Sequence, residues 1–490
     1  MDPRIFAGKG AEEPASFLVV MREQADLSGA ESFAEKTERG RFVFEALTAQ
    51  AEASQASLRA YLDARGIPYR SYYLVNMLEV EGTRSLAGEL AARREISSVA
   101  ANQAAPLSRV PEVPGMLAPL RAGRPESLSA VEPNIAKVGA PDVWARGFTG
   151  QGIVVGMADT GVAWDHPALK SHYRGFDGTN VSHDYNWHDA VHDAAAANPC
   201  GSDAPAPCDD DNHGTSTASI VVGDDGLGNQ IGMAPGARFI GCRNMDQGNG
   251  TPARYTECFQ FMIAPTDHNG ANPRPDLAAD VINNSWGCPT TEGCTDPNVL
   301  KAVVENVRAA GIAVVASAGN DGPACSTIAE PPAFYDASFS VGATSNSDTI
   351  ASFSSRGPVT ADGSNRLKPD ISAPGVGVRV ARPPDTYSSS FTGTSASSPH
   401  VTGAIALLWS AAPQLVGQVA ATIELLKRTA EPLISTQDCG GLPGAAVPNP
   451  VFGSGRVNVA AAVNVAAPPA RPKTVLSPRR TGTRRVNPRT

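Results

Sequence analysis

The central part of the chain carries short, continuous apolar runs separated by helical and loop segments. These runs lie at residues 153–158, 239–242, 281–284, 312–316 and 339–341. Apolar runs of this length, without polar alternation, are typical of parallel strands that are covered on both faces. Residues 298–310 have helical composition. The pattern over residues 132–466 therefore predicts an α/β domain built on a mostly parallel central sheet.

The first hundred residues show a different pattern. Residues 16–21 and 96–99 are strand-like runs, and residues 69–80 alternate like a strand. Residues 30–65 and 86–94 have helical composition. We therefore expect an N-terminal tail over residues 1–15 and a small α+β domain over residues 16–103.

Residues 104–131 contain five prolines and three arginines, which favour an irregular, exposed linker. Exposed linkers are where proteolysis concentrates, so this segment is a candidate processing region. Residues 467–490 are rich in proline, arginine and threonine and poor in large apolar residues, which predicts a disordered basic tail. Such a tail is either a solvated extension, the interpretation we favour, or a polybasic contact for an anionic partner.

Charge and hydropathy exclude two classes of protein. The formal net charge is −9, and because seven basic and no acidic residues lie in the last segment, the remainder carries −16. A body this acidic does not favour nucleic-acid binding. No run reaches the roughly 18 apolar residues of a membrane span, so we expect none. Residues 1–14 lack the apolar core of a secretory signal peptide.

Eight cysteines are present, and none lies in a C-x-x-C pair that would indicate a zinc or redox motif. An even number fits disulfides formed in an oxidising compartment. The pairs Cys200/Cys208 and Cys288/Cys294 are close enough to close small loops, although spacing leaves the full connectivity open. Buried free thiols are the alternative.

Three segments carry side chains suited to acyl transfer. Asp159 ends the apolar run of IVVGMADTGV, where α/β folds place ligands and catalysts. His213 lies in DNHGTSTAS, and Ser395 lies in TGTSASSPHVTG at the start of an apolar helix. Pro399 is expected in the first turn of that helix, where its missing N–H does little harm. Taken singly, these residues also fit a turn or cap, an ordinary polar position and an N-cap.

In the chain order Asp, His, Ser, the three segments closely resemble the active-site signatures of subtilisin-like serine proteases, the subtilases. Two further strings agree: AVVASAGNDG at residues 313–322 and VINNSWG at residues 281–287. Other strings, such as AWDHPALKSHYRG and VGATSNSDTIASFSSRGP, resemble the bacillopeptidase F-like group of this family. Residues 16–103 resemble, more weakly, the inhibitory propeptide common in subtilases.

The resemblance implies a subtilisin-like three-layer fold and a serine endopeptidase acting on proteins or peptides. Asp159, His213 and Ser395 would form the catalytic triad, and Asn320 would help to bind the oxyanion. No cofactor is needed for this chemistry. The substrate-binding positions that the resemblance implies are Ser285, Trp286, Gly287, Ser317, Gly319 and Glu330.

Glu330 falls near the floor of the family's specificity pocket, where many relatives have glycine. A carboxylate there would favour Arg or Lys at P1, the substrate residue before the cleaved bond. The alternative is that Glu330 faces solvent. The chain departs from the family pattern at Asn212, usually Gly, and at Ala396, usually Met. We expect activity to survive both.

The sequence allows alternatives for calcium binding, for the type of function and for the cellular location. The Asp- and Asn-rich residues 177–225 fit either a calcium-binding loop, as subtilases often have, or a solvated acidic loop, which we favour. The chain could be a general endopeptidase, a dedicated processing protease or a catalytically inactive binding scaffold; the intact triad argues against the last. The family and the cysteines indicate an extracellular protein, whereas the lack of a signal peptide allows a cytoplasmic pool restrained by the N-terminal domain or a separate inhibitor.

Overall fold

The computed structural model describes residues 1–10, 12–106, 131–224 and 228–468. Its largest element is a seven-stranded sheet in which every strand pairs in parallel with its neighbours. The strand order is β14 (Ile371–Pro374), β13 (Phe339–Thr344), β12 (Ala313–Ser317), β11 (Val281–Asn284), β6 (Val154–Asp159), β8 (Arg238–Arg243) and β7 (Trp187–Asp189). The five apolar runs of the sequence form five strands that are neighbours in this sheet, namely β13, β12, β11, β6 and β8.

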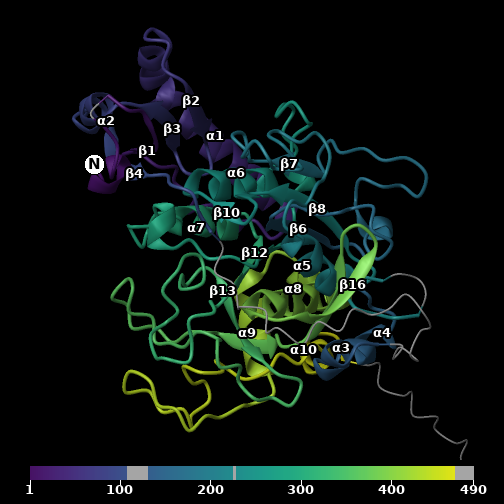
Figure 1. The fold of residues 1–490 in the computed structure, drawn as a ribbon. Helices are drawn as coiled ribbons and strands as arrows, with labels where there is room; N and C mark the ends of the chain where they lie inside the picture. The colour runs from purple at the N-terminus through teal and green to yellow at the C-terminus, as the bar shows by residue number, and fades with distance from the viewer. Residues whose placement is uncertain (11, 107–130, 225–227, 469–490) are drawn as a thin grey trace, which may run out of the picture.

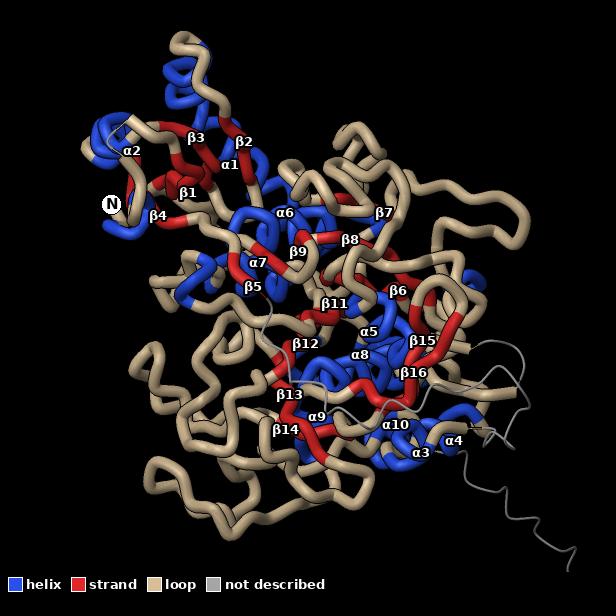
Figure 2. The backbone as a smooth tube through the Cα atoms, viewed as in Figure 1, coloured by secondary structure: helices blue, strands red, loops and turns tan. Residues whose placement is uncertain are grey.

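Helices cover both faces of this sheet (Figures 1 and 2). Alternate residues of one strand serve opposite faces: Val315 packs into one cluster, whereas Val314 and Ala316 pack into the other. One face is covered by α6 (Pro252–Ile263) and α7 (Lys301–Ala309). The other face is covered by α3 (Pro133–Lys137), α4 (Ala140–Trp144), α5 (His213–Val222), α8 (Thr394–Ala411), α9 (Val419–Arg428) and α10 (Val459–Ala466). The result is the three-layer α/β arrangement that the sequence predicts.

Two short strand systems lie beside the central sheet. The hairpin of β15 (Val378–Arg382) and β16 (Thr386–Phe391) packs on α5. The strands β5 (Ala105–Pro106), β9 (Met245–Asp246) and β10 (Asn249–Gly250) form a three-stranded antiparallel sheet. Short 3-10 helices are η1 (Pro3–Phe6), η2 (Ala30–Ser32), η3 (Lys170–His172), η4 (Pro275–Leu277), η5 (Thr290–Glu292) and η6 (Pro413–Leu415).

The N-terminal region forms its own antiparallel sheet, in the order β2 (Tyr69–Tyr72), β3 (Met77–Gly82), β1 (Ala15–Met21) and β4 (Ile96–Ala101). Its helices are α1 (Lys36–Asp63) and α2 (Arg84–Ala91). Phe17 and Val19 on β1 pack into the core of this region, whereas Leu18 joins the cluster that contains α6 and α7. One face of the small sheet therefore packs against the helical layer of the large one (Figure 1).

Two predictions about this region are wrong. Residues 1–15 are not a free tail, because η1 buries Ile5 and Phe6 and β1 already begins at Ala15. Residues 69–80 are not one strand but the hairpin β2–β3, in which Tyr72 pairs with Met77. The turn forms because its backbone N–H groups dock on a side chain of α6, a contact that no local pattern reveals. The predicted linker and basic tail lie mostly outside the described residues, at 107–130 and 469–490.

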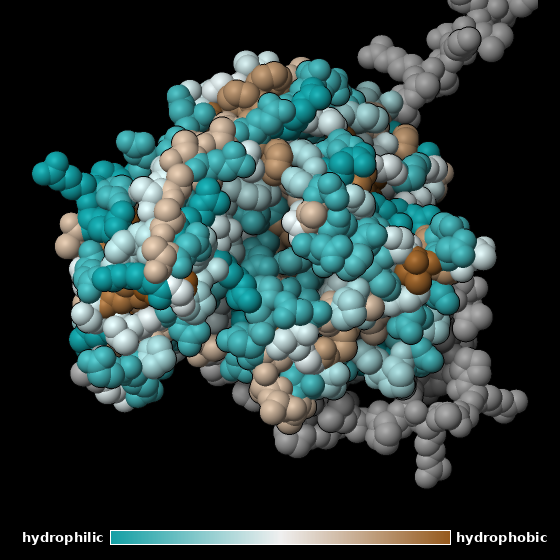
Figure 3. Space-filling model, turned by 90° about the horizontal axis from the view of Figure 1, so that it is seen from above, coloured by the Kyte–Doolittle hydropathy of each residue, from teal (hydrophilic) through white to brown (hydrophobic). Residues whose placement is uncertain are grey.

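All eight cysteines form disulfides, in the pairs Cys200–Cys208, Cys242–Cys258, Cys288–Cys294 and Cys325–Cys439. Both small loops expected from spacing are closed. Within the described ranges, no helix is long and apolar enough to cross a membrane. The surface seen from above is mostly hydrophilic, with small scattered hydrophobic patches (Figure 3).

Candidate active site

Asp159 and His213 meet where a strand ends and a helix begins. Asp159 is the last residue of β6, and His213 is the first residue of α5. His213 Nδ1 lies 2.7 Å from Asp159 Oδ1, and both side chains are buried. The backbone N–H of Thr160 donates to the same carboxylate oxygen at 2.8 Å. The carboxylate is thus placed to fix the orientation of the imidazole.

Close packing at this junction explains two features of the sequence around His213. A Cβ on Gly214 would lie 2.0 Å from the carbonyl oxygen of Gly161, so only glycine lets α5 start against the end of β6. Asn212 has a φ of 71°, a left-handed conformation that asparagine tolerates better than most residues. This conformation accounts for asparagine at a position where the family usually has glycine.

Ser395 lies in the first turn of α8, and α8 packs against α5. The helix begins at Thr394, so Pro399 falls in the second turn rather than in the first, as expected from the sequence. Because proline has no N–H, the carbonyl of Ser395 loses its usual helical partner. Ser285 Oγ donates to that carbonyl at 3.1 Å and replaces the missing bond.

The hydroxyl of Ser395 donates to the carbonyl oxygen of Ser285 at 3.1 Å. No hydrogen bond between Ser395 and His213 is present among the described residues. The hydroxyl of Ser395 is thus held by a backbone carbonyl in this structure. The imidazole of His213 is itself packed edge-on to Phe391, with ring centroids 5.6 Å apart.

Asn320 is oriented by the residue that precedes Ser395. Its Oδ1 accepts from Thr394 N and from Thr394 Oγ1, both at 2.9 Å. These two bonds fix which end of the amide carries the oxygen and leave Nδ2 as the donating end. The N–H of Ser395 is among the first four of α8, which have no intrahelical acceptor. The Asn320 amide and the backbone N–H of Ser395 are thus two donors at the start of α8.

A pocket next to Ser395 contains every substrate-binding residue that the sequence predicts. Its lining residues are Ser285, Trp286, Gly287, Ser317, Ala318, Gly319, Asn320, Asp321, Thr327, Glu330, Ala333 and Ser395. Glu330 is half-buried, and its Oε2 would lie 2.2 Å from a Cβ added to Gly287. Burial, and secondarily the charge of Asp321, raise the pKa of Glu330 to about 7.

The wall of this pocket is supported by residues that sequence reasoning missed. The indole of Trp286 stacks on Tyr255 with ring centroids 3.8 Å apart and donates to the carbonyl of Ala158 at 3.0 Å. Tyr255 in turn donates to the buried carboxylate of Glu292 at 2.9 Å. Burial raises the pKa of Glu292 well above its ordinary value. No motif marks Tyr255 or Glu292, because both belong to loops and helices remote in sequence.

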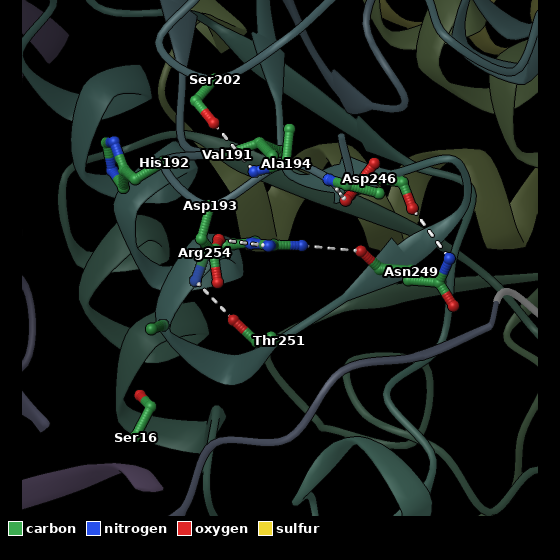
Figure 4. Close-up of polar contacts among 12 residues, drawn as sticks. Ser16, Val191, His192, Asp193, Ala194, Ser202, Asp246, Asn249, Thr251 and Arg254 are labelled. Atoms are coloured by element: carbon green, nitrogen blue, oxygen red, sulfur yellow. Dashed lines mark hydrogen bonds and ion pairs between the residues drawn. The ribbon is translucent and has the colours of Figure 1, made fainter. Parts of the chain in front are cut away.

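The short strand β10, in the middle of the small three-stranded sheet, is fixed by side chains from neighbouring segments (Figure 4). Arg254 donates to the carbonyl of Asn249 at 3.0 Å and pairs with Asp193 at 2.5 Å. Thr251 caps α6 by accepting from the N–H of Arg254. The strand β10 is thus fixed, and it pairs antiparallel with Ala105 and Pro106 of β5.

Metal binding has no support in the described part of the chain, where no three or more His, Cys, Asp or Glu side chains are grouped to hold an ion. The calcium interpretation of residues 177–225 stays a prediction.

Comparison with known proteins places this geometry in a family. Residues 150–455, more than half of the chain, match the sequence profile described as "Subtilase family". The chain belongs to the subtilase family. The subtilisin-like fold predicted from the sequence is thereby confirmed.

Three curated relatives of this subtilase, all from Bacillus subtilis (strain 168), show how far the similarity extends. Bacillopeptidase F is 35% identical over 468 residues, which cover 92% of this chain but 30% of that protein. Subtilisin E is 31% identical over 290 residues, covering 59% of this chain and 63% of that protein. Serine protease AprX is 33% identical over 292 residues, covering 55% and 59%. The chain thus spans less than two thirds of each relative's length.

Proposed function

We propose that this subtilase is a serine endopeptidase that hydrolyses peptide bonds in proteins through an acyl-enzyme. The observation that carries the proposal is the buried 2.7 Å contact between His213 and Asp159 beside the N-terminus of the helix that presents Ser395. An inactive scaffold would not need this contact, the oriented amide of Asn320 and a pocket next to Ser395 together.

In the proposed reaction, Ser395 Oγ attacks the substrate carbonyl while His213 takes its proton. Asp159 holds the imidazole and stabilises the imidazolium that forms. Asn320 Nδ2 and the Ser395 N–H donate to the oxyanion. His213 then gives its proton to the leaving amine, and water releases the acyl group by the same steps in reverse.

We further propose that the pocket prefers Arg or Lys at P1. The support is the position of Glu330, whose carboxylate lies against the backbone of Gly287 inside the pocket. A cationic side chain there would form a charge-assisted hydrogen bond with little competition from water. Cleavage after basic residues suits a protease that matures a particular precursor as well as one that degrades proteins generally.

We also propose that residues 16–103 act as an inhibitory propeptide domain and that residues 132–466 are the catalytic domain. In support, Lys36 Nζ pairs with Asp280 at 2.7 Å, and Asn306 Nδ2 donates to the carbonyl of Leu74 at 2.7 Å. The chain then leaves the small domain as the extended strand β5, which pairs antiparallel with β10. Such a strand occupies an edge that substrate would otherwise pair with.

Location follows from the same family and from the disulfides. Four disulfides indicate an oxidising compartment, so we propose that the protease works outside the cell.

The decisive experiment compares the purified chain with Ser395→Ala, with a fluorophosphonate probe, casein hydrolysis and N-terminal mapping over time. We expect labelling and casein hydrolysis only in the wild type, with a new N-terminus within residues 104–131. An intact wild type that still cuts casein would refute the role of a cleaved propeptide. A wild type that is folded, unlabelled and inert would refute the protease proposal in favour of a scaffold.

A further inference from the structure

A carboxylate that belongs to no sequence signature lies between the two segments that carry Asp159 and His213. Asp209 follows the Cys200–Cys208 disulfide and precedes His213 by four residues. Its backbone forms an isolated antiparallel bridge with Gly161, two residues beyond Asp159. Asp209 is therefore held against the end of β6 while its chain continues into α5.

The Asp209 carboxylate accepts five hydrogen bonds. Its Oδ1 accepts from Thr160 Oγ1 at 2.8 Å, from Asp211 N at 3.1 Å and from Asn212 N at 2.9 Å. Its Oδ2 accepts from Thr215 N at 2.8 Å and from Thr215 Oγ1 at 2.5 Å. Every donor lies within two residues of either Asp159 or His213.

These bonds make Asp209 the cap of α5. Asn212 stands at the N-cap position, but its side chain makes no capping hydrogen bond. Asp209 instead accepts the N–H of Thr215, the third residue of the helix, as an N-cap side chain would. An anionic group at a helix N-terminus is also favoured by the helix dipole.

The same carboxylate reaches the segment that carries Asp159. Thr160 Oγ1, which donates to Asp209, accepts the N–H of Gly214 at 3.0 Å. The N–H of Thr160 donates to Asp159 at 2.8 Å. A continuous chain of hydrogen bonds therefore runs from the Asp159 carboxylate through Thr160 to Asp209 and on to the first turn of α5.

We infer that Asp209 is a positioning residue, which sets the distance and the ring orientation between Asp159 and His213. The inference rests on the proposed function, because it concerns the same reaction. Asp209 touches neither substrate nor reacting atoms. It acts by locking the end of β6 and the start of α5 into one rigid unit, so that the imidazole is held in the right tautomer before substrate binds.

The test is Asp209→Asn in the full chain, which keeps the size but turns an Nδ2 donor toward N–H groups. We expect kcat to fall by about 10- to 100-fold, as for small misplacements of catalytic groups, with KM changed by less than about threefold. Fluorophosphonate labelling should slow in parallel. The acidic limb of the kcat/KM profile should move to lower pH, because a misplaced Asp159 stabilises the His213 imidazolium less well.

The matched control is Asp210→Asn, one residue along the same loop. Asp210 pairs with buried Arg243 at 3.1 Å and accepts from Asn198 at 2.6 Å, and its side chain holds none of the groups that Asp209 holds. Arg243 lies opposite Asp159 in the pairing of β8 with β6, so this control also tests for indirect disturbance of that strand end. We expect this control to lower the melting temperature and to keep the kcat and pH profile of the wild type. A second variant, Thr160→Val, removes the bond to Asp209 and the bond from the Gly214 N–H but keeps the other four bonds of Asp209. It should give a smaller kcat loss with the same pH shift.

The inference and the proposed function fail differently. A wild type that neither labels nor hydrolyses casein refutes the proposed function, and the inference falls with it. An active wild type overturns the inference alone if Asp209→Asn keeps the kcat and the pH profile. The inference is also overturned if Asp210→Asn loses as much kcat as Asp209→Asn. If Asp209→Asn does not fold, the inference is overturned when Thr160→Val keeps the kcat and the pH profile of the wild type.

Discussion

At the scale of single residues, we expect Glu330 to make the proposed substrate preference depend on pH. Its pKa is raised to about 7, so the carboxyl is neutral below that pH and anionic above it. We expect kcat/KM for a P1 Arg peptide, relative to a P1 Gln peptide, to rise as pH increases from about 6 to about 8. Glu330→Gln should remove this rise and lower kcat/KM for P1 Arg by about 10- to 100-fold at the upper pH, the worth of a charged hydrogen bond.

The P1 Gln peptide is the internal control, because it has a similar length and no charge. Equal losses for both peptides in Glu330→Gln would mean that the residue shapes the pocket without selecting charge. The same raised pKa has a consequence for stability. The native state binds this proton more tightly than the unfolded chain, so the contribution of Glu330 to stability decreases as pH rises from about 4.5 to about 7.

A variant of Asn320 should affect the chemical step and leave substrate binding nearly unchanged. Asn320 Oδ1 accepts from Thr394, so Nδ2 is the donating end of the amide. Asn320→Ala should lower kcat by about 10²–10³-fold with little change in KM, because the lost bond strengthens only as the oxyanion forms. Steady-state kinetics on a short peptide measure this split. A rise in KM at unchanged kcat would instead assign Asn320 to ground-state binding.

Substitutions of Asn212 test whether its backbone conformation determines which residue is found there. At a φ of 71°, glycine is unstrained, whereas alanine costs about 1 kcal/mol. Asn212→Gly should therefore keep the free energy of unfolding, and Asn212→Ala should lower it by about that amount, as measured by urea denaturation. Equal stabilities of the two variants would rule out backbone conformation as the reason for the residue found there.

At the scale of elements, the start of α8 is held by a bond from outside the helix. Ser285 on the segment after β11 donates to the Ser395 carbonyl that Pro399 leaves without a partner. Ser285→Ala should lower the free energy of unfolding by about 1–3 kcal/mol, the cost of an unsatisfied buried carbonyl.

Pro399→Ala supplies the missing N–H and gives a double-mutant cycle. In the Pro399→Ala background, the loss caused by Ser285→Ala should be smaller, because the helix then satisfies its own carbonyl. Additive losses would show that the bond from Ser285 is not a replacement for the helical one. Kinetics on the same four proteins would show whether the nucleophile moves.

At the scale of the whole molecule, the N-terminal domain docks through backbone groups of its β2–β3 turn. Gln260 Oε1 on α6 accepts from Tyr73 N at 2.8 Å and from Leu74 N at 3.2 Å. Gln260→Ala should weaken docking by about 30-fold, since each of the two bonds contributes about 1 kcal/mol. Proteolytic activity should then appear earlier after purification, as followed by hydrolysis of a fluorogenic peptide.

The exposed Gln414, on η6, provides the matched control as Gln414→Ala, because its side chain donates to the carbonyl of Ala466 and not to the β2–β3 turn. It should develop activity at the rate of the wild type. If both variants behave like the wild type, the β2–β3 turn does not determine how firmly the small domain restrains the enzyme.

Local sequence by itself determined the five central strands of the large sheet (β13, β12, β11, β6 and β8) and the three segments that carry the candidate triad. It could do so because a strand buried on both faces must be continuously apolar, and because His213 and Ser395 each lie in a short string that shapes a helix start. The α/β class follows from the order of those elements.

Only the tertiary structure decided which distant groups meet. The bond of Ser285 to the Pro399 helix, the stack of Tyr255 on Trp286 and the packing of Phe6 under the small sheet join positions far apart in the chain. Asp209 is close to His213 in sequence, yet its role depends on Thr160 at the end of another element. A periodic pattern in the sequence indicates whether a residue is buried. Which residues it contacts depends on how the whole chain packs around the sheet.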